Sequence, residues 1–138
     1  MKIYFAGSIR GGREFQKFYV EIISHLKNYG KVMTEHIGNL DIEASGETDL
    51  TDVEIYVRDK NWITSSDVIV AEVSNPSLGV GYELGLAESL GKKVLCLHFN
   101  GNQNPLSAMV AGNDSFRIER YSNSDDLKVI LDNFFQKI

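Results

Sequence analysis

Apolar residues along this chain alternate between short continuous runs and longer segments in which they recur every three or four positions. The short runs predict β-strands at residues 2–7, 31–36, 67–73, 93–99 and 116–121. The periodic segments between them predict amphipathic α-helices. Strands that alternate with helices are typical of a parallel sheet covered on both faces.

Periodicity and capping residues place the helices. Residues 12–30 and 124–138 carry apolar side chains at helical spacing. Thr51 and Glu54 match a capping box, which predicts a helix over residues 51–66. A further helix is predicted to follow the third strand.

Two glycines and two polar segments complete the pattern. Gly30 is predicted to form the left-handed cap of the first helix, and Gly91 to close the helix after the third strand. Residues 37–50 are polar and acidic without a period, which indicates a loop. Residues 100–115 read as a long connection with one helical turn near SAMV.

This pattern fits a single flavodoxin-like or Rossmann-like domain over residues 1–138, with a five-stranded parallel sheet in the order 2-1-3-4-5. Ligands of such sheets bind outside the carboxyl ends of the strands. Polar or glycine-rich motifs lie at the carboxyl ends of four predicted strands: GSIRGG, NPSLGVGYE and NPLS follow the first, third and fourth strands, and EH ends the second. The functional site is therefore predicted at this edge.

Composition narrows the class of protein. Hydrophobic residues make up 43% of the chain and charged residues 24%, as in soluble globular proteins. No apolar run approaches the roughly 20 residues of a membrane span. A net charge of −5 without a Lys/Arg cluster argues against a nucleic-acid polymer as partner. The single Cys96 suits a buried strand position in a reducing cytoplasm, so a cytoplasmic protein is expected.

The segment GSIRGGR, residues 7–13, lies between a predicted strand and a predicted helix. Its glycines let backbone N–H groups approach an oxyanion, and Ser8 and Arg10 add donors suited to phosphate. The spacing matches neither a Walker A loop nor a GxGxxG motif. A tight turn with a surface arginine explains the same residues, so the local pattern leaves both interpretations open.

The segment SLGVGYELG places Glu83 among Val80, Tyr82 and Leu84. A carboxylate in such poorly solvated surroundings is expected to be paired, hydrogen-bonded or catalytic. The nearby helix start is expected to keep Glu83 ionised, as a nucleophile requires. The glycine spacing departs from the dinucleotide fingerprint, so no cofactor is expected.

Glycosyl chemistry also requires a proton donor for the leaving group, with Asp59, Asp67 and Glu72 as candidates. Asp67 begins its strand at the wrong end of the sheet, and Glu72 can point to either face. Spacing alone favours Asp59 as a surface charge. His36 ends the second predicted strand, but no cluster with metal-ligand spacing accompanies it, so no metal site is predicted.

Six blocks carry a family resemblance: YFAGSIRGGR, GKVMTEH, RDKNW, DVIVAEVSNPSLGVGYELG, GKKVLCL and PLSAM. In this order they resemble the 2′-deoxynucleoside 5′-monophosphate N-glycosidases of the nucleoside 2-deoxyribosyltransferase superfamily. The resemblance spans residues 2–109 and implies roles for the matching residues. Glu83 matches the nucleophile, Asp59 the general acid/base and Tyr4 a tyrosine near the sugar, which overrides the surface interpretation of Asp59. The implied phosphate contacts are Ser8, Arg10, Gly11, Gly12, Ser77 and Ser107, and the implied sugar or base contacts are Gly7, Ile9, His36 and Gly79.

The resemblance also implies an activity and an assembly. The activity is hydrolysis of the N-glycosidic bond of 2′-deoxynucleoside 5′-monophosphates, through a covalent intermediate on Glu83. The assembly is a homodimer in which Ser107 reaches the neighbouring site, and residues 37–50 border the base pocket. Three alternatives stay open: a nucleoside 2-deoxyribosyltransferase, a CMP-type ribonucleotide N-glycosidase and a non-catalytic nucleotide sensor.

Overall fold

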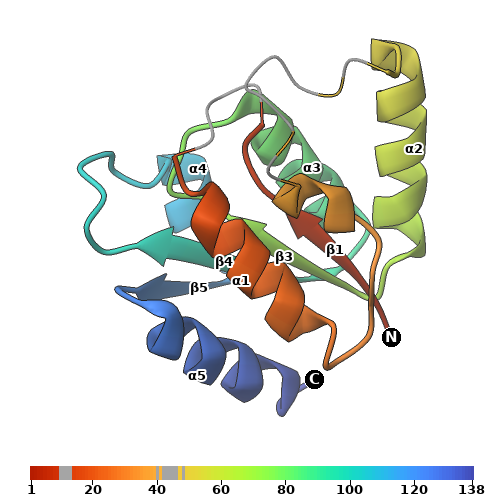
Figure 1. Ribbon diagram of the computed structural model, residues 1–138. Coiled ribbons are helices and arrows are strands. Elements are labelled where there is room, and N and C mark those ends of the chain that lie inside the picture. The colour runs from red at the N-terminus through yellow and green to blue at the C-terminus, as the bar shows by residue number, and fades with distance from the viewer. Residues whose placement is uncertain (10–13, 40, 42–46, 48) are drawn as a thin grey trace.

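The computed structural model describes residues 1–9, 14–39, 41, 47 and 49–138, which form one parallel sheet with helices on both faces (Figure 1). The strand order is β2-β1-β3-β4-β5, which confirms the predicted fold and order. The strands are β1 Lys2–Ala6, β2 Lys31–Val32, β3 Val68–Glu72, β4 Lys93–Phe99 and β5 Phe116–Tyr121. The helices are α1 Gln16–Leu26, the 3₁₀-helix η1 Glu35–Gly38, α2 Asp52–Ser65, α3 Leu78–Ser89, α4 Ala108–Ala111 and α5 Ser124–Phe135.

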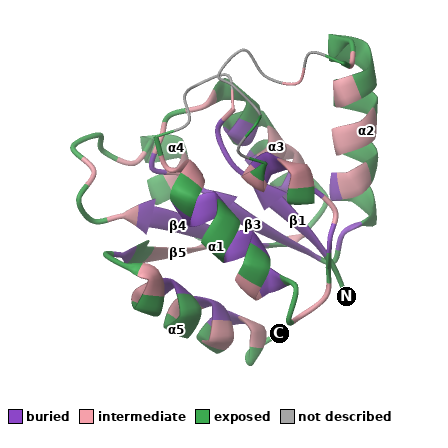
Figure 2. Cartoon of the chain, in the orientation of Figure 1, coloured by how far each residue is buried: buried purple, intermediate pink, exposed green. Residues whose placement is uncertain are grey.

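The central strands are buried (Figure 2). Their alternate residues enter two separate cores, one on each face of the sheet. In β1, Ile3 and Phe5 pack with residues of α1 and α5, whereas Tyr4 and Ala6 pack with residues of α2 and α3. This alternation follows from the two-residue period of a strand. It sends the side chain of Tyr4 to the face of the sheet that α3 covers.

The prediction of a strand over residues 31–36 is wrong after Val32, where β2 ends. The Thr34 hydroxyl accepts from the Phe5 N–H at 2.8 Å and donates to the Phe5 carbonyl at 2.7 Å. A side chain therefore satisfies the backbone groups of β1 that a longer β2 would have paired. Because the Thr34 side chain takes the place of these backbone partners, the following residues can leave the sheet and form η1, which carries His36.

The prediction that Gly30 is a left-handed cap is also wrong. Among the described residues only Gly91 has a positive φ, of 63°. Helix α1 ends at Leu26, and a Cβ on Gly30 would lie 2.2 Å from the Met1 carbonyl oxygen, so this glycine permits a close approach of two backbone segments. Gly91 closes α3 as predicted, with its N–H donating to the Glu88 carbonyl at 2.9 Å.

Other local predictions agree with the structure. The capping box forms, with the Thr51 hydroxyl and the Glu54 carboxylate each accepting from the backbone N–H of the other residue. The turn at SAMV is α4. Cys96 is fully buried in β4, and burial raises the pKa of its thiol to about 12. Within the described part of the chain, every helix is too short or too polar to span a membrane.

Candidate active site

A cavity of about 600 Å³ opens at the carboxyl ends of β1 and β3, where the strand order changes direction. This volume lies within the range of small-molecule sites. Its inner wall is formed by the end of β1 and the start of α3, and its outer wall by η1, residue 47 and α2. The lining residues are Gly7, Ile9, His36, Ile37, Glu47, Asp52, Ile55, Tyr56, Asp59, Pro76, Ser77, Leu78, Gly79, Val80 and Glu83.

Glu83 lies in the wall of this cavity and is hydrogen-bonded to β1. The Tyr4 hydroxyl donates to its carboxylate with an oxygen–oxygen distance of 2.5 Å. Tyr4 itself is fully buried, and burial together with the Glu83 charge raises the pKa of its phenol far above the ordinary value. The phenol therefore keeps its proton and acts as a fixed donor to Glu83.

The expectation that the start of α3 keeps Glu83 ionised is wrong. Glu83 is the sixth residue of the helix, and the favourable effect of a helix start fades within the first turn. Burial raises the pKa of the Glu83 carboxyl to about 7, and the Asp59 charge acts in the same direction. The hydrogen bond from Tyr4 opposes this shift and is what favours the carboxylate.

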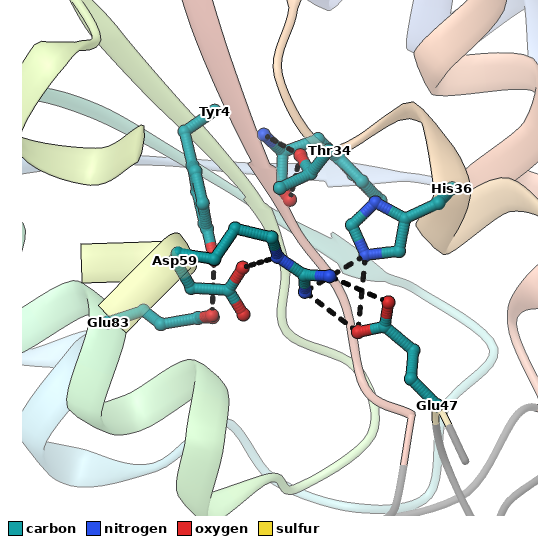
Figure 3. Close-up of polar contacts among 8 residues, drawn as sticks. Tyr4, Thr34, His36, Glu47, Asp59 and Glu83 are labelled. Carbon is teal, nitrogen blue, oxygen red and sulfur yellow. Dashed lines mark hydrogen bonds and ion pairs between the residues drawn. The ribbon is translucent and has the colours of Figure 1, made fainter. Parts of the chain in front are cut away.

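Asp59 projects from α2 toward the same space as Glu83 (Figure 3). Its side chain is 21% exposed, so its interpretation as a surface charge is wrong. The Arg58 Nε donates to the Asp59 carboxylate at 2.8 Å. Two carboxyl groups in different surroundings thus share the cavity, one bound to a phenol and the other to a guanidinium.

The residues matched to a phosphate site are distributed over several places. Ser77 caps α3, its hydroxyl accepting from the Val80 N–H at 3.3 Å, and it lines the cavity with Gly79. Ser8 is fully buried, and its hydroxyl accepts from the Asn75 amide at 3.2 Å. The structure does not bring Ser107 into this cavity: it lines a neighbouring groove between α3 and α4. The predicted contacts Arg10, Gly11 and Gly12 lie outside the described residues.

The remaining matched residues line the cavity. Gly7 and Ile9 follow β1, and a Cβ on Gly7 would lie 3.0 Å from the Tyr19 ring. His36 enters from η1, and burial lowers the pKa of its imidazole. The neutral ring lies 5.8 Å from the Trp62 ring, between centroids. Gly7, Ile9 and His36 therefore lie in the wall of the same cavity as Glu83.

Sequence reasoning missed Glu47 and Arg58. Glu47 accepts from Arg58 Nη1 at 2.8 Å and from Nη2 at 2.7 Å, and the guanidinium lowers the pKa of its carboxyl. The Glu47 carboxylate is also 3.5 Å from His36 Nε2. Glu47 belongs to an acidic segment in which apolar residues show no periodicity, so its position could not be predicted. The sequence feature that could have indicated the pair is Arg58, a cation directly before Asp59.

Asp67 and Glu72 are excluded as partners of Glu83. Asp67 accepts from the Lys2 N–H at 2.7 Å, at the amino end of the sheet. Glu72 is fully buried on the α1 and α5 face, where it accepts from Tyr121 and Ser74. Among the described residues, no group of three His, Cys, Asp or Glu side chains is placed to hold a metal ion.

A doubly wound sheet with two carboxyl groups in one cavity is the arrangement expected of an α/β enzyme that acts on glycosidic bonds. More specifically, the chain belongs to the nucleoside 2-deoxyribosyltransferase family, whose sequence profile matches residues 3–131.

Individual relatives are similar over almost the whole chain. The 5-hydroxymethyl-dUMP N-hydrolase of Rattus norvegicus is 46% identical, over 97% of this chain and 84% of the relative. The enzyme of the same name from Danio rerio is 44% identical, over 100% of this chain and 98% of the relative. The solved structure of the CMP N-glycosidase BcmB of Clostridium botulinum has a TM-score of 0.69 at 19% identity, over 97% of this chain and 99% of that one, which shows a shared fold.

Proposed function

We propose that this chain hydrolyses the N-glycosidic bond of 2′-deoxynucleoside 5′-monophosphates, releasing the base and 2-deoxyribose 5-phosphate. The observation that carries the proposal is the Glu83 carboxylate, bound by Tyr4 and facing Asp59 in a cavity of nucleotide size. The names of the relatives support the substrate class, since 5-hydroxymethyl-dUMP is such a nucleotide. Residues 1–138 act as one catalytic domain, in the cytoplasm.

The reaction uses the two carboxyl groups in succession. The Glu83 carboxylate attacks C1′ while protonated Asp59 gives its proton to the leaving base, so a C–O bond forms as the C–N bond breaks. Asp59, now a carboxylate, then takes a proton from water as this water attacks C1′ and displaces Glu83. Tyr4 holds Glu83 in position and accommodates its changing charge.

The 5′-phosphate is proposed to bind at the start of α3. The start of a helix presents backbone N–H groups that favour an anion, and Ser77 and Gly79 lie there at the cavity wall. The further phosphate contacts that the family resemblance implies are Ser8, Arg10, Gly11 and Gly12, of which Arg10, Gly11 and Gly12 lie outside the described residues. In this arrangement Gly7, Ile9 and His36 contact the sugar or base.

A panel of nucleoside monophosphates, assayed for free base by chromatography, tests the proposal. We expect a deoxynucleoside 5′-monophosphate to be hydrolysed at least about a hundredfold faster than the matching nucleoside, because charge-assisted hydrogen bonds to the phosphate are lost in the nucleoside. Transfer of deoxyribose to a second base would favour the 2-deoxyribosyltransferase alternative. Faster hydrolysis of CMP would favour the ribonucleotide enzyme, and tight binding without release of any base would favour a sensor.

Tyr4→Phe is expected to lower kcat/KM at pH 7 about tenfold, because a hydrogen bond to a charged group contributes about 1.5 kcal/mol. Without this donor the pKa of Glu83 rises further above 7. The ascending limb of the pH profile of kcat/KM therefore moves to higher pH in the variant. Ionisation of the substrate phosphate affects wild type and variant equally, so it cannot cause this difference. A variant profile that differs from wild type only by a constant factor would contradict this role of Tyr4.

We also propose a homodimer in which Ser107 contacts the phosphate in the neighbouring site. Ser107 lies in a groove lined by the exposed side chains of Leu78 and Met109, which are 97% and 84% accessible. Apolar side chains that are this exposed support the proposal that a second copy of the chain covers this groove. Light scattering is expected to give twice the chain mass, and Met109→Asp to give a monomer with reduced kcat/KM. A wild-type monomer with full activity would overturn the assembly.

A further inference from the structure

The guanidinium of Arg58 joins the outer wall of the cavity to Asp59. It donates through Nη1 and Nη2 to the two oxygens of Glu47, and through Nε to one oxygen of Asp59. Its Cζ lies 4.7 Å from the centre of the Trp62 ring, and Nη2 is 3.4 Å from His36 Nε2. The side chains of Arg58 and Glu47 are 20% and 17% exposed, so this pair is partly shielded from water.

This arrangement contains a chemical conflict that Glu47 resolves. Asp59 must carry a proton when the base leaves, whereas a carboxylate that accepts from a guanidinium favours its ionised form. A guanidinium can present two parallel N–H groups to one carboxylate, which is its strongest mode of pairing. Here Glu47 takes the Nη1–Nη2 edge, and Asp59 receives the single Nε–H.

We propose that Glu47 is a positioning residue that engages the Arg58 guanidinium and so leaves Asp59 able to hold the proton for the departing base. This inference rests on the proposed function and extends it to a residue outside the family motifs. Glu47 acts through Arg58 and does not itself contact the reacting atoms.

The charged and titratable groups around Asp59 divide into two sets. Arg58 on α2 favours the carboxylate form. Glu83 from α3 and Glu47 from the segment before α2 are negative and favour the protonated form. Asp52 and Tyr56, also on α2, line the same cavity, and the Asp52 carboxyl adds a further acidic group. Tyr4 from β1 and His36 from η1 are uncharged at neutral pH, because burial raises the pKa of the phenol and lowers that of the imidazole. Removal of the Glu47 charge therefore shifts the balance toward ionised Asp59 twice, by freeing Arg58 and by removing a negative charge.

The pH dependence of kcat tests the inference. In Glu47→Gln the descending limb of the profile is expected to move about one pH unit lower, so that kcat falls about tenfold on this limb and stays near wild type at the acidic end. The double variant Glu47→Gln with Arg58→Gln is expected to return the limb toward the wild-type position, since the cation that holds Asp59 ionised is gone. Glu35→Gln is the matched control, because Glu35 neighbours His36 in sequence but pairs with Lys27 at 2.6 Å.

Two results would overturn the inference. The first is a descending limb of the kcat profile that stays at the wild-type pH in Glu47→Gln. The second is a loss of kcat in Glu47→Gln that is equal at every pH and that the added Arg58→Gln substitution does not relieve, which is the result expected of a merely structural role. Both presuppose an active wild-type enzyme. If wild type releases no base from any monophosphate, the proposed function itself fails, so the two failures are distinguishable.

Discussion

Glu83→Gln is expected to reduce kcat for base release by at least about ten-thousand-fold, because a neutral amide cannot act as the nucleophile that forms the proposed covalent intermediate. Glutamine has nearly the same shape and still receives the hydrogen bond from Tyr4, so the cavity stays intact. The measurement is release of base from a deoxynucleoside monophosphate under single-turnover conditions. Glu21→Gln, an exposed position on α1, is the matched control and is expected to keep wild-type activity.

The same substitution is expected to leave the protein as stable as wild type or more stable at pH 8. Burial raises the pKa of Glu83 to about 7, so the folded state tolerates the ionised group poorly, and a neutral amide removes this cost. Stable but inactive protein would show that a functional group is held at the expense of stability.

With a 2′-fluorinated analogue, which slows turnover, wild type is expected to gain the mass of the sugar phosphate on Glu83. Substantial activity in Glu83→Gln, or an adduct on another residue, would remove the nucleophile from the mechanism.

Between pH 5 and 8 the wild-type free energy of unfolding is expected to fall by roughly 2 to 3 kcal/mol through ionisation of Glu72, and Glu72→Gln is expected to abolish this part of the fall. Burial raises the pKa of Glu72 from its usual 4.5 to about 7, and the hydrogen bonds from Ser74 and Tyr121 only partly offset this shift. A raised pKa means that the folded state binds the proton more tightly than the unfolded chain. The stabilisation is therefore complete below pH 4.5 and is lost as the pH rises through 7.

Chemical denaturation at a series of pH values measures this effect. Wild type is expected to lose stability from pH 5 to 8, and Glu72→Gln to lose less, with Glu21→Gln following wild type. Glu83 contributes a slope of the same sign, so the variant with both substitutions is expected to lose still less stability in this range than Glu72→Gln. Parallel curves for wild type and Glu72→Gln would mean that Glu72 ionises in the fold as easily as in the unfolded chain.

The sequence by itself determined the order of elements and the edge of the sheet that carries the site. Apolar runs and helical spacing are local properties, and so are the capping box at Thr51 and the left-handed turn at Gly91. Each is set by residues within one or two turns of one another, so each survives in the fold. Glu83 could be located on the same grounds, as the one acid inside an apolar, glycine-rich segment after a strand.

Only the tertiary structure decided which side chains meet. A two-residue period shows that Glu72 and Val70 share a face of β3, but the cores assign that face to α1 and α5. Thr34 ends β2 because its hydroxyl pairs with Phe5 on another strand. Such outcomes depend on partners far away in the chain, which no local pattern encodes.

The site follows the same division. Tyr4 and Glu83 are 79 positions apart, and their hydrogen bond exists because Tyr4 of β1 lies on the face of the sheet whose core also contains α3. Glu47 and Arg58 meet across a segment without periodicity, so their pairing had no signature in the pattern of apolar residues. Local spacing thus fixes the elements and their exposed faces, whereas contacts between distant elements fix the charges and protons on which the chemistry depends.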